Sequence, residues 1–172
     1  MYKNNCGTLK SQTIDLWRGC EEVIPEFDEN GNLLPGVHFG EWEEFQQRFG
    51  TTLRRQRMID GLELAMTQLK AAGCRTIYID GSFVTSKPNP GDFDACWDDD
   101  GVDIDYLKSI APTLYNSALR RAEQKSKYKG EIFPANYPAN DAGTVYLDFF
   151  QFDTRTNTRK GIIAIDLQRW IP

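Results

Sequence analysis

The chain has 172 residues, of which 40% are hydrophobic and 26% are charged. These values are typical of one globular domain with its own core, and they exclude a fibrous repeat or a generally disordered chain. The formal net charge of −5 comes from one segment, because residues 92–105 contain seven aspartates and the rest of the chain is slightly basic, so an acidic surface over the whole molecule is not expected.

Signals for targeting and for a zinc cage are missing from the sequence. No apolar stretch follows a basic start, and no apolar run approaches the roughly 20 residues that span a bilayer. The four cysteines contain no Cys-x-x-Cys pair, and we assign no role to the one histidine, His38. The sequence therefore predicts a cytoplasmic protein with free thiols and no membrane association.

The N-terminal part is expected to be a lead-in, residues 1–50, to a single domain that spans residues 1–172. Asn30-Gly31 lies between short apolar pieces and is the strongest hairpin signal in the chain. The segment GEWEEFQQRFG predicts a short helix that ends at Gly50.

A longer helix is expected next, capped by Thr51 or Thr52 and ending before Gly73. Its apolar residues recur at spacings of three and four, which places them on one helix face. They are Met58, Leu62, Ala65, Leu69 and Ala72. This stripe predicts a face packed against the core, and the segment RTIYID that follows is the first clear strand.

The second half of the chain predicts further strands and helices. DFDACW is expected to be a strand, Asp103 or Asp105 to cap a helix around YLKSIA, and Pro112 to begin another helix that runs to about Lys127. TVYLDFF and GIIAIDL are predicted as the last strands, joined by the polar, hairpin-like segment QFDTRTNTRK. This order of elements predicts an α/β (α+β) fold in which a mixed sheet is backed by helices.

Two motifs follow each other in the segment YIDGSFVTSKPNPGDFDACW: Gly81-Ser82 after one strand, and Asp92 and Asp94 at the start of the next. Because side chains alternate along a strand, the two carboxylates are expected on one side. Their repulsion favours a bound cation, and Mg²⁺ prefers one or two carboxylates together with phosphate oxygens. The glycine lets an anion approach the backbone, and the serine hydroxyl and nearby amides can hold phosphate oxygens.

This arrangement resembles the nucleotidyltransferase superfamily, which includes DNA polymerase beta, kanamycin nucleotidyltransferase and the minimal MNT domains of bacteria. Its members share Gly-Ser or Gly-Gly, a spacer of about ten residues, and Asp-x-Asp or Asp-x-Glu. Here nine residues separate Gly81-Ser82 from Asp92-Phe93-Asp94. The longer string also looks like a small bacterial family of uncharacterised proteins placed in that superfamily, and the resemblance implies a nucleotidyltransferase-like fold.

The superfamily usually has a third carboxylate on a neighbouring strand. Asp148 in TVYLDFF is our first choice, because a charge inside an apolar run is costly to bury without a partner. Asp166 in GIIAIDL is the second. For either residue the alternative is a core aspartate that accepts backbone hydrogen bonds.

The resemblance implies a metal-dependent enzyme that moves an NMP from an NTP, for example ATP, to a hydroxyl on a protein, an RNA 3′ end or a small molecule. The catalytic residues, which would also hold Mg²⁺ or Mn²⁺, are Asp92, Asp94 and Asp148. The residues expected to bind the nucleotide are Gly81, Ser82 and Lys87. In small superfamily members of this kind, the implied context is a toxin–antitoxin pair or another bacterial defence module, which would bring a protein partner.

Several alternatives stay open from the sequence. A solvated loop is the alternative to phosphate contact for Lys87, Arg159 and Lys160, and a solvated face is the alternative to RNA or partner binding for the basic helix Leu119–Lys129. A catalytically inactive nucleotidyltransferase fold that serves as a binding module is the main alternative function. A glycosyltransferase that uses Asp-x-Asp is a third.

Overall fold

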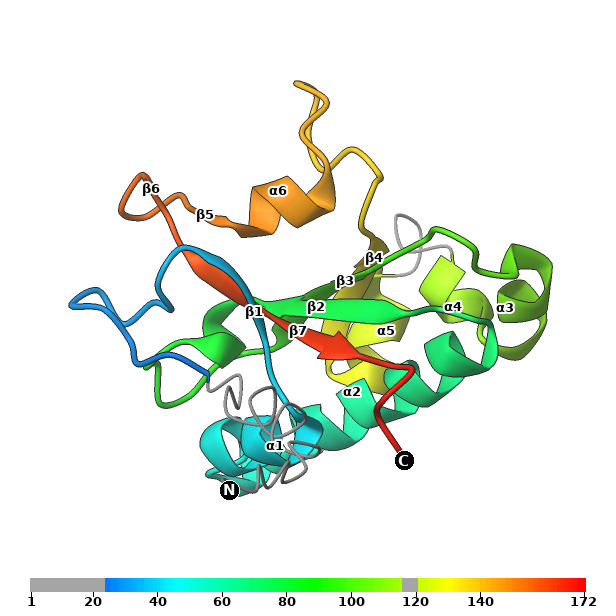
Figure 1. The fold of residues 1–172 in the computed structure, drawn as a ribbon, viewed down its shortest axis with the longest axis horizontal. Helices are drawn as coiled ribbons and strands as arrows, with labels where there is room; N and C mark the ends of the chain where they lie inside the picture. The colour runs from blue at the N-terminus through cyan, green and yellow to red at the C-terminus, as the bar shows by residue number, and fades with distance from the viewer. Residues whose placement is uncertain (1–23, 116–120) are drawn as a thin grey trace, which may run out of the picture.

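The computed structural model describes residues 24–115 and 121–172, so the first 23 residues of the expected lead-in, and Arg120 of the basic helix, lie outside the described residues. A five-stranded mixed sheet with the order β1-β7-β2-β3-β4 lies at the centre of the fold (Figure 1). Its strands are β1 (Gly36–Phe39), β2 (Thr76–Asp80), β3 (Phe93–Trp97), β4 (Gly130–Pro134) and β7 (Gly161–Asp166). The predicted α/β fold with a mixed sheet is confirmed.

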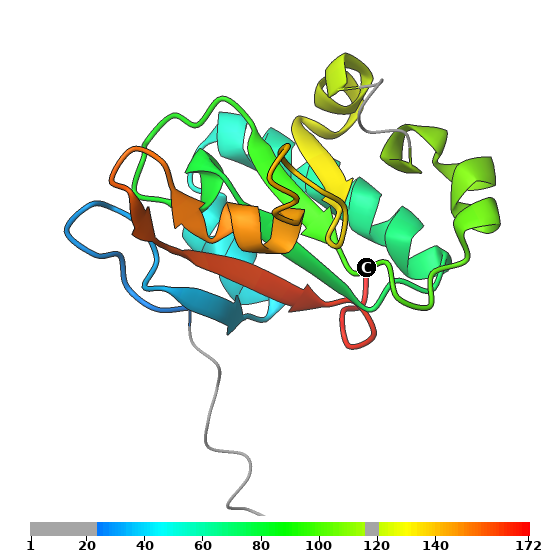
Figure 2. The ribbon, with the colours of Figure 1, turned by 90° about the horizontal axis from the view of Figure 1, so that it is seen from above.

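Helices cover both faces of the sheet (Figures 1 and 2). One side carries α1 (Trp42–Phe49), α2 (Leu53–Ala71) and α5 (Arg121–Tyr128), and the other carries α6 (Tyr146–Phe150) with the hairpin of β5 (Phe152–Asp153) and β6 (Thr158–Arg159). The remaining short helices are η2 (Ser82–Val84), α3 (Ile104–Ile110) and α4 (Pro112–Tyr115). None of the helices in the described part of the chain has the length and apolar character needed to cross a membrane.

The larger core lies between the sheet and the helices α1 and α2. The apolar stripe predicted for α2 is buried along its whole length, and its N-terminus is capped as expected, because the Thr52 hydroxyl accepts a hydrogen bond from the backbone amide of Arg55. Parts of the expected lead-in belong to this core: β1 pairs in parallel with β7, and Trp42, Phe45 and Phe49 of α1 are buried. Turn formation at Asn30-Gly31 is confirmed by an antiparallel bridge that flanks it.

The opposite face of the sheet carries a smaller apolar cluster under α6. It consists of Cys96, Phe133, Ala135, Phe150 and Ile162. This second cluster explains why one strand prediction is wrong. TVYLDFF supplies α6, a single amphipathic turn that packs Phe150 onto the sheet, and the segment does not join the sheet as a strand.

Two further predictions need correction. The strand beside β3 is β4, from the segment GEIFP, which the sequence pattern did not single out. The helix expected from Pro112 to about Lys127 is also not continuous, because α4 ends at Tyr115 and α5 begins at Arg121, with residues 116–120 outside the described part. Both differences arise on the side of the sheet where β4 and α5 pack together.

Gly61 of α2 allows this packing, and it gives a test of the fold. An alanine there would place its Cβ against the backbone carbonyl of Tyr128 at the end of α5. Replacing glycine by alanine inside a helix normally stabilises it by about 1 kcal/mol. We expect Gly61→Ala to destabilise the protein instead, and to lower the free energy of unfolding by about 1–3 kcal/mol. The overlap is with backbone atoms, so no flexible side chain can move to relieve it.

Urea unfolding of the wild type and the variant measures this change. Gly91→Ala is the matched control, because a Cβ on Gly91 meets nothing within 4 Å. A Gly61→Ala protein as stable as the wild type would mean that α2 and α5 do not pack as described.

Candidate functional site

Three carboxylates stand side by side on neighbouring strands. Asp80 of β2 lies opposite Asp94 of β3 in the antiparallel register, and Asp94 lies opposite Glu131 of β4 in the parallel register. Residues directly opposite one another share a face of the sheet, with Cβ atoms roughly 5 Å apart. We call Asp80, Asp94 and Glu131 the carboxylate row.

A lysine neutralises the first member of the row. The ammonium of Lys160 lies 2.7 Å and 3.0 Å from the two carboxylate oxygens of Asp80, and the exposed fractions of the two side chains are 13% and 6%. Burial raises the pKa of Asp80, and the Lys160 ammonium opposes that rise. Lys160 is therefore part of the site, and the solvated-turn alternative for this residue is wrong.

Asp94 is the member of the row without a direct partner. No described residue donates a hydrogen bond to its carboxylate or forms an ion pair with it. Burial, followed by the negative charges of Asp80, Asp92 and Glu131, raises the pKa of Asp94 to about 7. A cation placed here would remove this electrostatic penalty.

Cations of helix α5 face Asp92 and Glu131. The Lys125 ammonium lies 2.8 Å from an oxygen of Asp92 and 3.6 Å from one of Glu131, and the Arg121 guanidinium is also 3.6 Å from Glu131. The hydrogen bond from Lys125 to Asp92 raises the pKa of Lys125. Two residues of the predicted basic helix thus approach the carboxylates, one helical turn apart.

A buried glutamine fixes α5 to β4. The amide nitrogen of Gln124 donates to the carbonyls of Thr113 and Ile132, and its amide oxygen accepts from the backbone amide of Ile132. Gln124 is fully buried. These bonds hold the backbone next to Glu131 and the helix that carries Arg121 in one geometry.

Gly81 is required by its contact with Asp94. Its φ angle is +80°, and an added Cβ would lie 2.5 Å from a carboxylate oxygen of Asp94. Only glycine combines this backbone conformation with so close an approach. The motif Gly81-Ser82 and the aspartate of β3 are therefore in direct contact.

The loop between the two motifs is held by arginines of α2. The buried guanidinium of Arg55 donates hydrogen bonds to the carbonyls of Phe83 (2.8 Å) and Lys87 (2.6 Å), and it lies over the Phe83 ring. Arg54 donates to the carbonyls of Pro90 and Gly91. The side chain of Lys87 is exposed on this loop, at the edge of the site.

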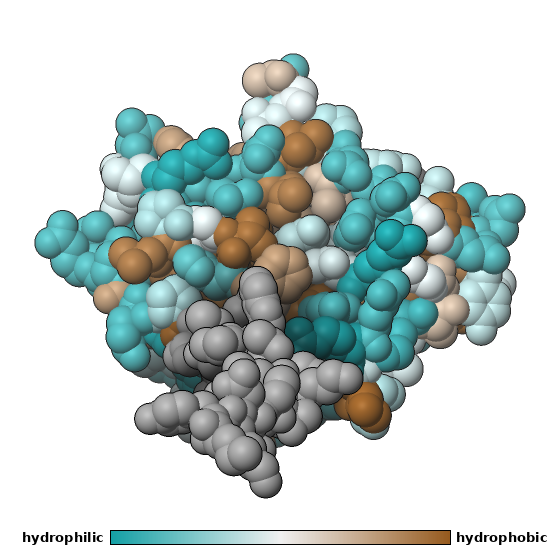
Figure 3. All heavy atoms as spheres, viewed as in Figure 1, coloured by the Kyte–Doolittle hydropathy of each residue, from teal (hydrophilic) through white to brown (hydrophobic). Residues whose placement is uncertain are grey.

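A cavity of about 670 Å³ lies above the carboxylate row. Its floor includes Asp80, Gly81, Ser82, Asp94, Glu131 and Lys160. Asp92 precedes β3 and does not line this cavity, so the expectation that Asp92 and Asp94 lie together on one side is wrong. Its wall is aromatic, formed by Phe133, Tyr146, Phe149, Phe150 and Phe152. On the face seen in Figure 3, hydrophobic side chains gather around α6 and are surrounded by hydrophilic residues. The volume lies in the range of cavities that bind small molecules and cofactors.

The structure does not bring Asp148 or Asp166 to this row. Asp148 is exposed on α6, and it is not among the residues that line the cavity. Asp166 pairs with Thr76 at the far end of β2, about 13 Å along the strand from Asp80. Asp148 lies on a helix, so the strand placement expected for it is wrong, whereas Asp166 does lie on a strand, β7, which pairs with β2. Glu131 is the carboxylate that lies beside Asp94 on the next strand.

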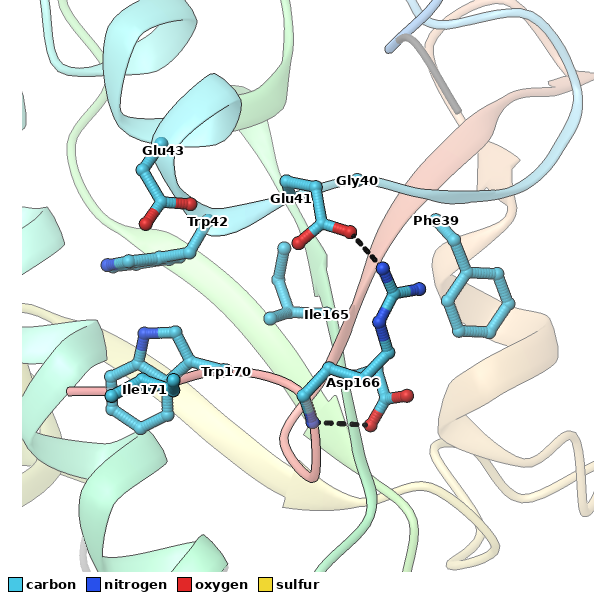
Figure 4. Close-up of a pocket in the computed structure, with 10 residues that line it drawn as sticks. Phe39, Gly40, Glu41, Trp42, Glu43, Ile165, Asp166, Trp170 and Ile171 are labelled. Carbon is cyan, nitrogen blue, oxygen red and sulfur yellow. Dashed lines mark hydrogen bonds and ion pairs between the residues drawn. The ribbon is translucent and has the colours of Figure 1, made fainter. Parts of the chain in front are cut away.

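Asp166 belongs to a second cavity, of about 380 Å³, at the opposite end of the sheet (Figure 4). Its carboxylate accepts hydrogen bonds from the backbone amides of Gln168 and Arg169, which close a turn. This is the alternative role foreseen for a core aspartate. The Glu41–Arg169 ion pair and the rings of Trp42 and Trp170 complete this cavity, which contains no residue of the two motifs.

The oxygen ligands around Asp94 fit a hard divalent cation such as Mg²⁺ or Mn²⁺. No group of three or more His, Cys, Asp or Glu side chains in residues 24–115 and 121–172 is arranged so that it could hold a metal ion without further ligands. Lysines hold Asp80 and Asp92, whereas the ion pairs of Glu131 with Arg121 and Lys125 are longer, at 3.6 Å. Asp94, with Glu131 beside it, is therefore the carboxylate best placed to bind an ion. One or two carboxylates completed by substrate oxygens is the coordination that Mg²⁺ prefers.

Sequence reasoning missed Asp80 and Glu131, and it left phosphate contact and a solvated turn open for Lys160. Asp80 was visible as the last residue of the strand before Gly81, and Glu131 shares its side of a short strand with Phe133, in the alternation typical of a sheet. The signal for Lys160 was weaker, because a lysine next to a polar hairpin is usually solvated. Only the pairing of strands far apart in the chain shows that these residues meet.

The chain belongs to a family of unknown function, DUF6932, which matches residues 25–166. No curated protein and no solved structure matches the chain significantly. Functional inference therefore depends on the geometry of the carboxylate row and its cavity.

The raised pKa of Asp94 predicts a pH-dependent stability in metal-free buffer. Because folding raises this pKa from 3.8 to about 7, the folded state binds the proton more tightly, and the free energy of unfolding falls as the pH rises between these values. Asp94→Asn cannot ionise, so its stability relative to the wild type should increase from pH 4.5 to pH 8. Urea unfolding at both values, with EDTA present, measures the difference.

Asp60→Asn, at an exposed position of α2, is the control and should follow the wild-type pH dependence. A stability difference between Asp94→Asn and wild type that is the same at both pH values would contradict the described environment of Asp94.

Proposed function

We propose that this member of the DUF6932 family is a metal-dependent nucleotidyltransferase that moves an NMP from an NTP to a hydroxyl acceptor. The observation that carries the proposal is the unpartnered carboxylate of Asp94, in contact with Gly81 at the floor of the 670 Å³ cavity. The resemblance of Gly81-Ser82 and Asp92-Phe93-Asp94 to the nucleotidyltransferase motif supports the same reaction.

Asp94 and Glu131 would hold the divalent cation, and Asp92 would join them once Lys125 moves away from it. When bound, the ion supplies charge neutralisation on the phosphates and a lowered pKa for the attacking hydroxyl. Carboxylates on neighbouring strands of a packed sheet are fixed in position, which is what such a site needs. Glu131 replaces Asp148 as the third carboxylate in this proposal.

The other cavity residues would bind the NTP. The Ser82 hydroxyl and the ammonium of Lys160 face the cavity and would contact phosphate oxygens, with Lys87 at its edge. The rings of Phe149 and Phe152, which are 39% and 40% exposed, would pack against the base. Together these groups would place the α-phosphorus near Asp94.

The transfer step is a displacement at the α-phosphorus. The acceptor oxygen bonds to the α-phosphorus while the bond to the oxygen that bridges the α- and β-phosphates breaks, and pyrophosphate leaves with that electron pair. The hydroxyl proton passes to a carboxylate of the row. The toxin–antitoxin or defence context remains a proposal from the motif resemblance alone.

A binding module without turnover is the second candidate. The observation that favours it is that lysines already pair with two of the nearby aspartates, Asp80 with Lys160 and Asp92 with Lys125. Such internal pairs can satisfy an acidic site that holds no metal. This candidate predicts nucleotide or partner binding without release of pyrophosphate.

Glu131 and Asp148 are the two candidates for the third carboxylate, and their variants discriminate between them. We expect Glu131→Gln and Asp94→Asn to lower NMP transfer from an α-labelled NTP by about 10²-fold or more, because each removes a carboxylate that would hold the divalent cation. We expect Asp148→Asn to transfer at the wild-type rate, since the side chain is exposed on α6. Transfer of label to protein, RNA and small-molecule fractions is the readout.

The opposite pattern, loss of transfer in Asp148→Asn with retention in Glu131→Gln, would restore Asp148 as the third carboxylate. Wild-type protein that binds NTPs in a thermal-shift assay but releases no pyrophosphate with any acceptor fraction would favour the binding module.

A further inference from the structure

A smaller cavity, of about 300 Å³, is lined by residues of α2 and α5 and by Asp92, two residues before Asp94 of the carboxylate row. Four of its lining residues are cationic, and together they define what we call the basic pocket: Arg54, Arg57, Lys125 and Lys129. The other lining residues are Met58, Gly91 and Asp92. Four positive charges therefore face one negative charge in a small concave space.

The positive charge of the basic pocket is not balanced by the described part of the chain. No described carboxylate lies within 4 Å of the cationic groups of Arg54, Arg57 or Lys129, whereas Lys125 pairs with Asp92 and Glu131. Arg54 is fixed in place because it donates to the carbonyls of Pro90 and Gly91. An oriented guanidinium and unpaired cations of this kind recognise anions, and above all phosphate.

The place of the basic pocket relative to the reaction centre is its second distinctive feature. Asp92 lines the basic pocket, whereas Asp94, two residues further along, lines the larger cavity proposed for the NTP. A group held in the basic pocket thus approaches the carboxylates from a different side than the NTP. In a transfer reaction, this is the position of the acceptor.

We propose that the basic pocket binds a phosphate group of the acceptor, next to the hydroxyl that receives the NMP. This inference rests on the proposed function and deepens it, because it names the acceptor as a phosphorylated molecule. The phosphate can belong to the 3′-terminal phosphodiester of an RNA or to a small phosphate ester. The described lining contains no aromatic ring on which a base would stack, so recognition depends on the phosphate.

Lys125 links the two cavities. Lys125 lines the basic pocket, where its ammonium lies 2.8 Å from Asp92, and it also lies 3.6 Å from Glu131, which lines the larger cavity. A phosphate in the pocket offers this ammonium a second partner and weakens its hold on Asp92. Acceptor binding thereby frees a carboxylate for the divalent cation, and the site is completed when both substrates are present.

Fluorescence anisotropy with a 3′-hydroxyl pentaribonucleotide, labelled at its 5′ end, tests the proposal without NTP or metal. Unlabelled pentaribonucleotide and glycerol 3-phosphate serve as competitors. We expect Arg57→Gln and Lys129→Gln each to weaken binding of the recognised probe about tenfold, since each loses a charge-assisted contact with phosphate. Lys127→Gln is the matched control: Lys127 lies on the same helix, is exposed and does not line the pocket.

Competition by glycerol 3-phosphate at concentrations near those of the RNA would assign the pocket to a small phosphate ester, and competition by RNA alone would assign it to a polynucleotide. Equal loss of binding in Lys127→Gln would show non-specific charge attraction and overturn the proposal, as would wild-type protein that does not bind the labelled RNA at low salt. NTP binding is measured separately by thermal shift, so a failed acceptor site is distinguishable from a failed nucleotidyltransferase site.

Discussion

Electrostatic repulsion within the carboxylate row is the constraint on which the site depends. The pairing of β2, β3 and β4 places Asp80, Asp94 and Glu131 next to one another in a partly buried environment, where each charge raises the cost of ionising the next. The chain offsets this cost with Lys160 on one side and with cations of α5 on the other. Asp94, in the centre, is left for a cation from outside the protein.

The loop that joins the two motifs links this site to the hydrophobic core. Arg55 is 5% exposed, and its guanidinium binds backbone carbonyls of the loop while it packs over the ring of Phe83. Loss of so buried a cation would leave several carbonyls without donors, each at a cost of about 1–3 kcal/mol. The start of α2 therefore determines where Gly81 and Asp94 meet, and its neighbour Arg54 contributes to the basic pocket. One helix end supports both proposed substrate sites.

Local sequence patterns predicted the features that depend on residues close together in the chain. The period of α2 and its cap at Thr52 both followed from spacing and residue type. The third carboxylate was not predicted correctly, because the long apolar run TVYLDFF has the pattern of a strand, whereas in the structure it forms α6 and packs on the sheet. Glu131 lies in a strand of five residues whose only distinguishing feature is its pairing with β3. Such long-range pairing determines which charges meet, and no local pattern encodes it.

The central claim is that the carboxylate row binds a divalent cation together with a nucleoside triphosphate. Electron paramagnetic resonance of Mn²⁺, titrated into the protein with and without an NTP analogue that resists cleavage between the α- and β-phosphates, tests it most directly. The account predicts that the analogue tightens Mn²⁺ binding and that Asp94→Asn removes this effect. Equal Mn²⁺ affinity in the wild type and in Asp94→Asn, with or without the analogue, would contradict it.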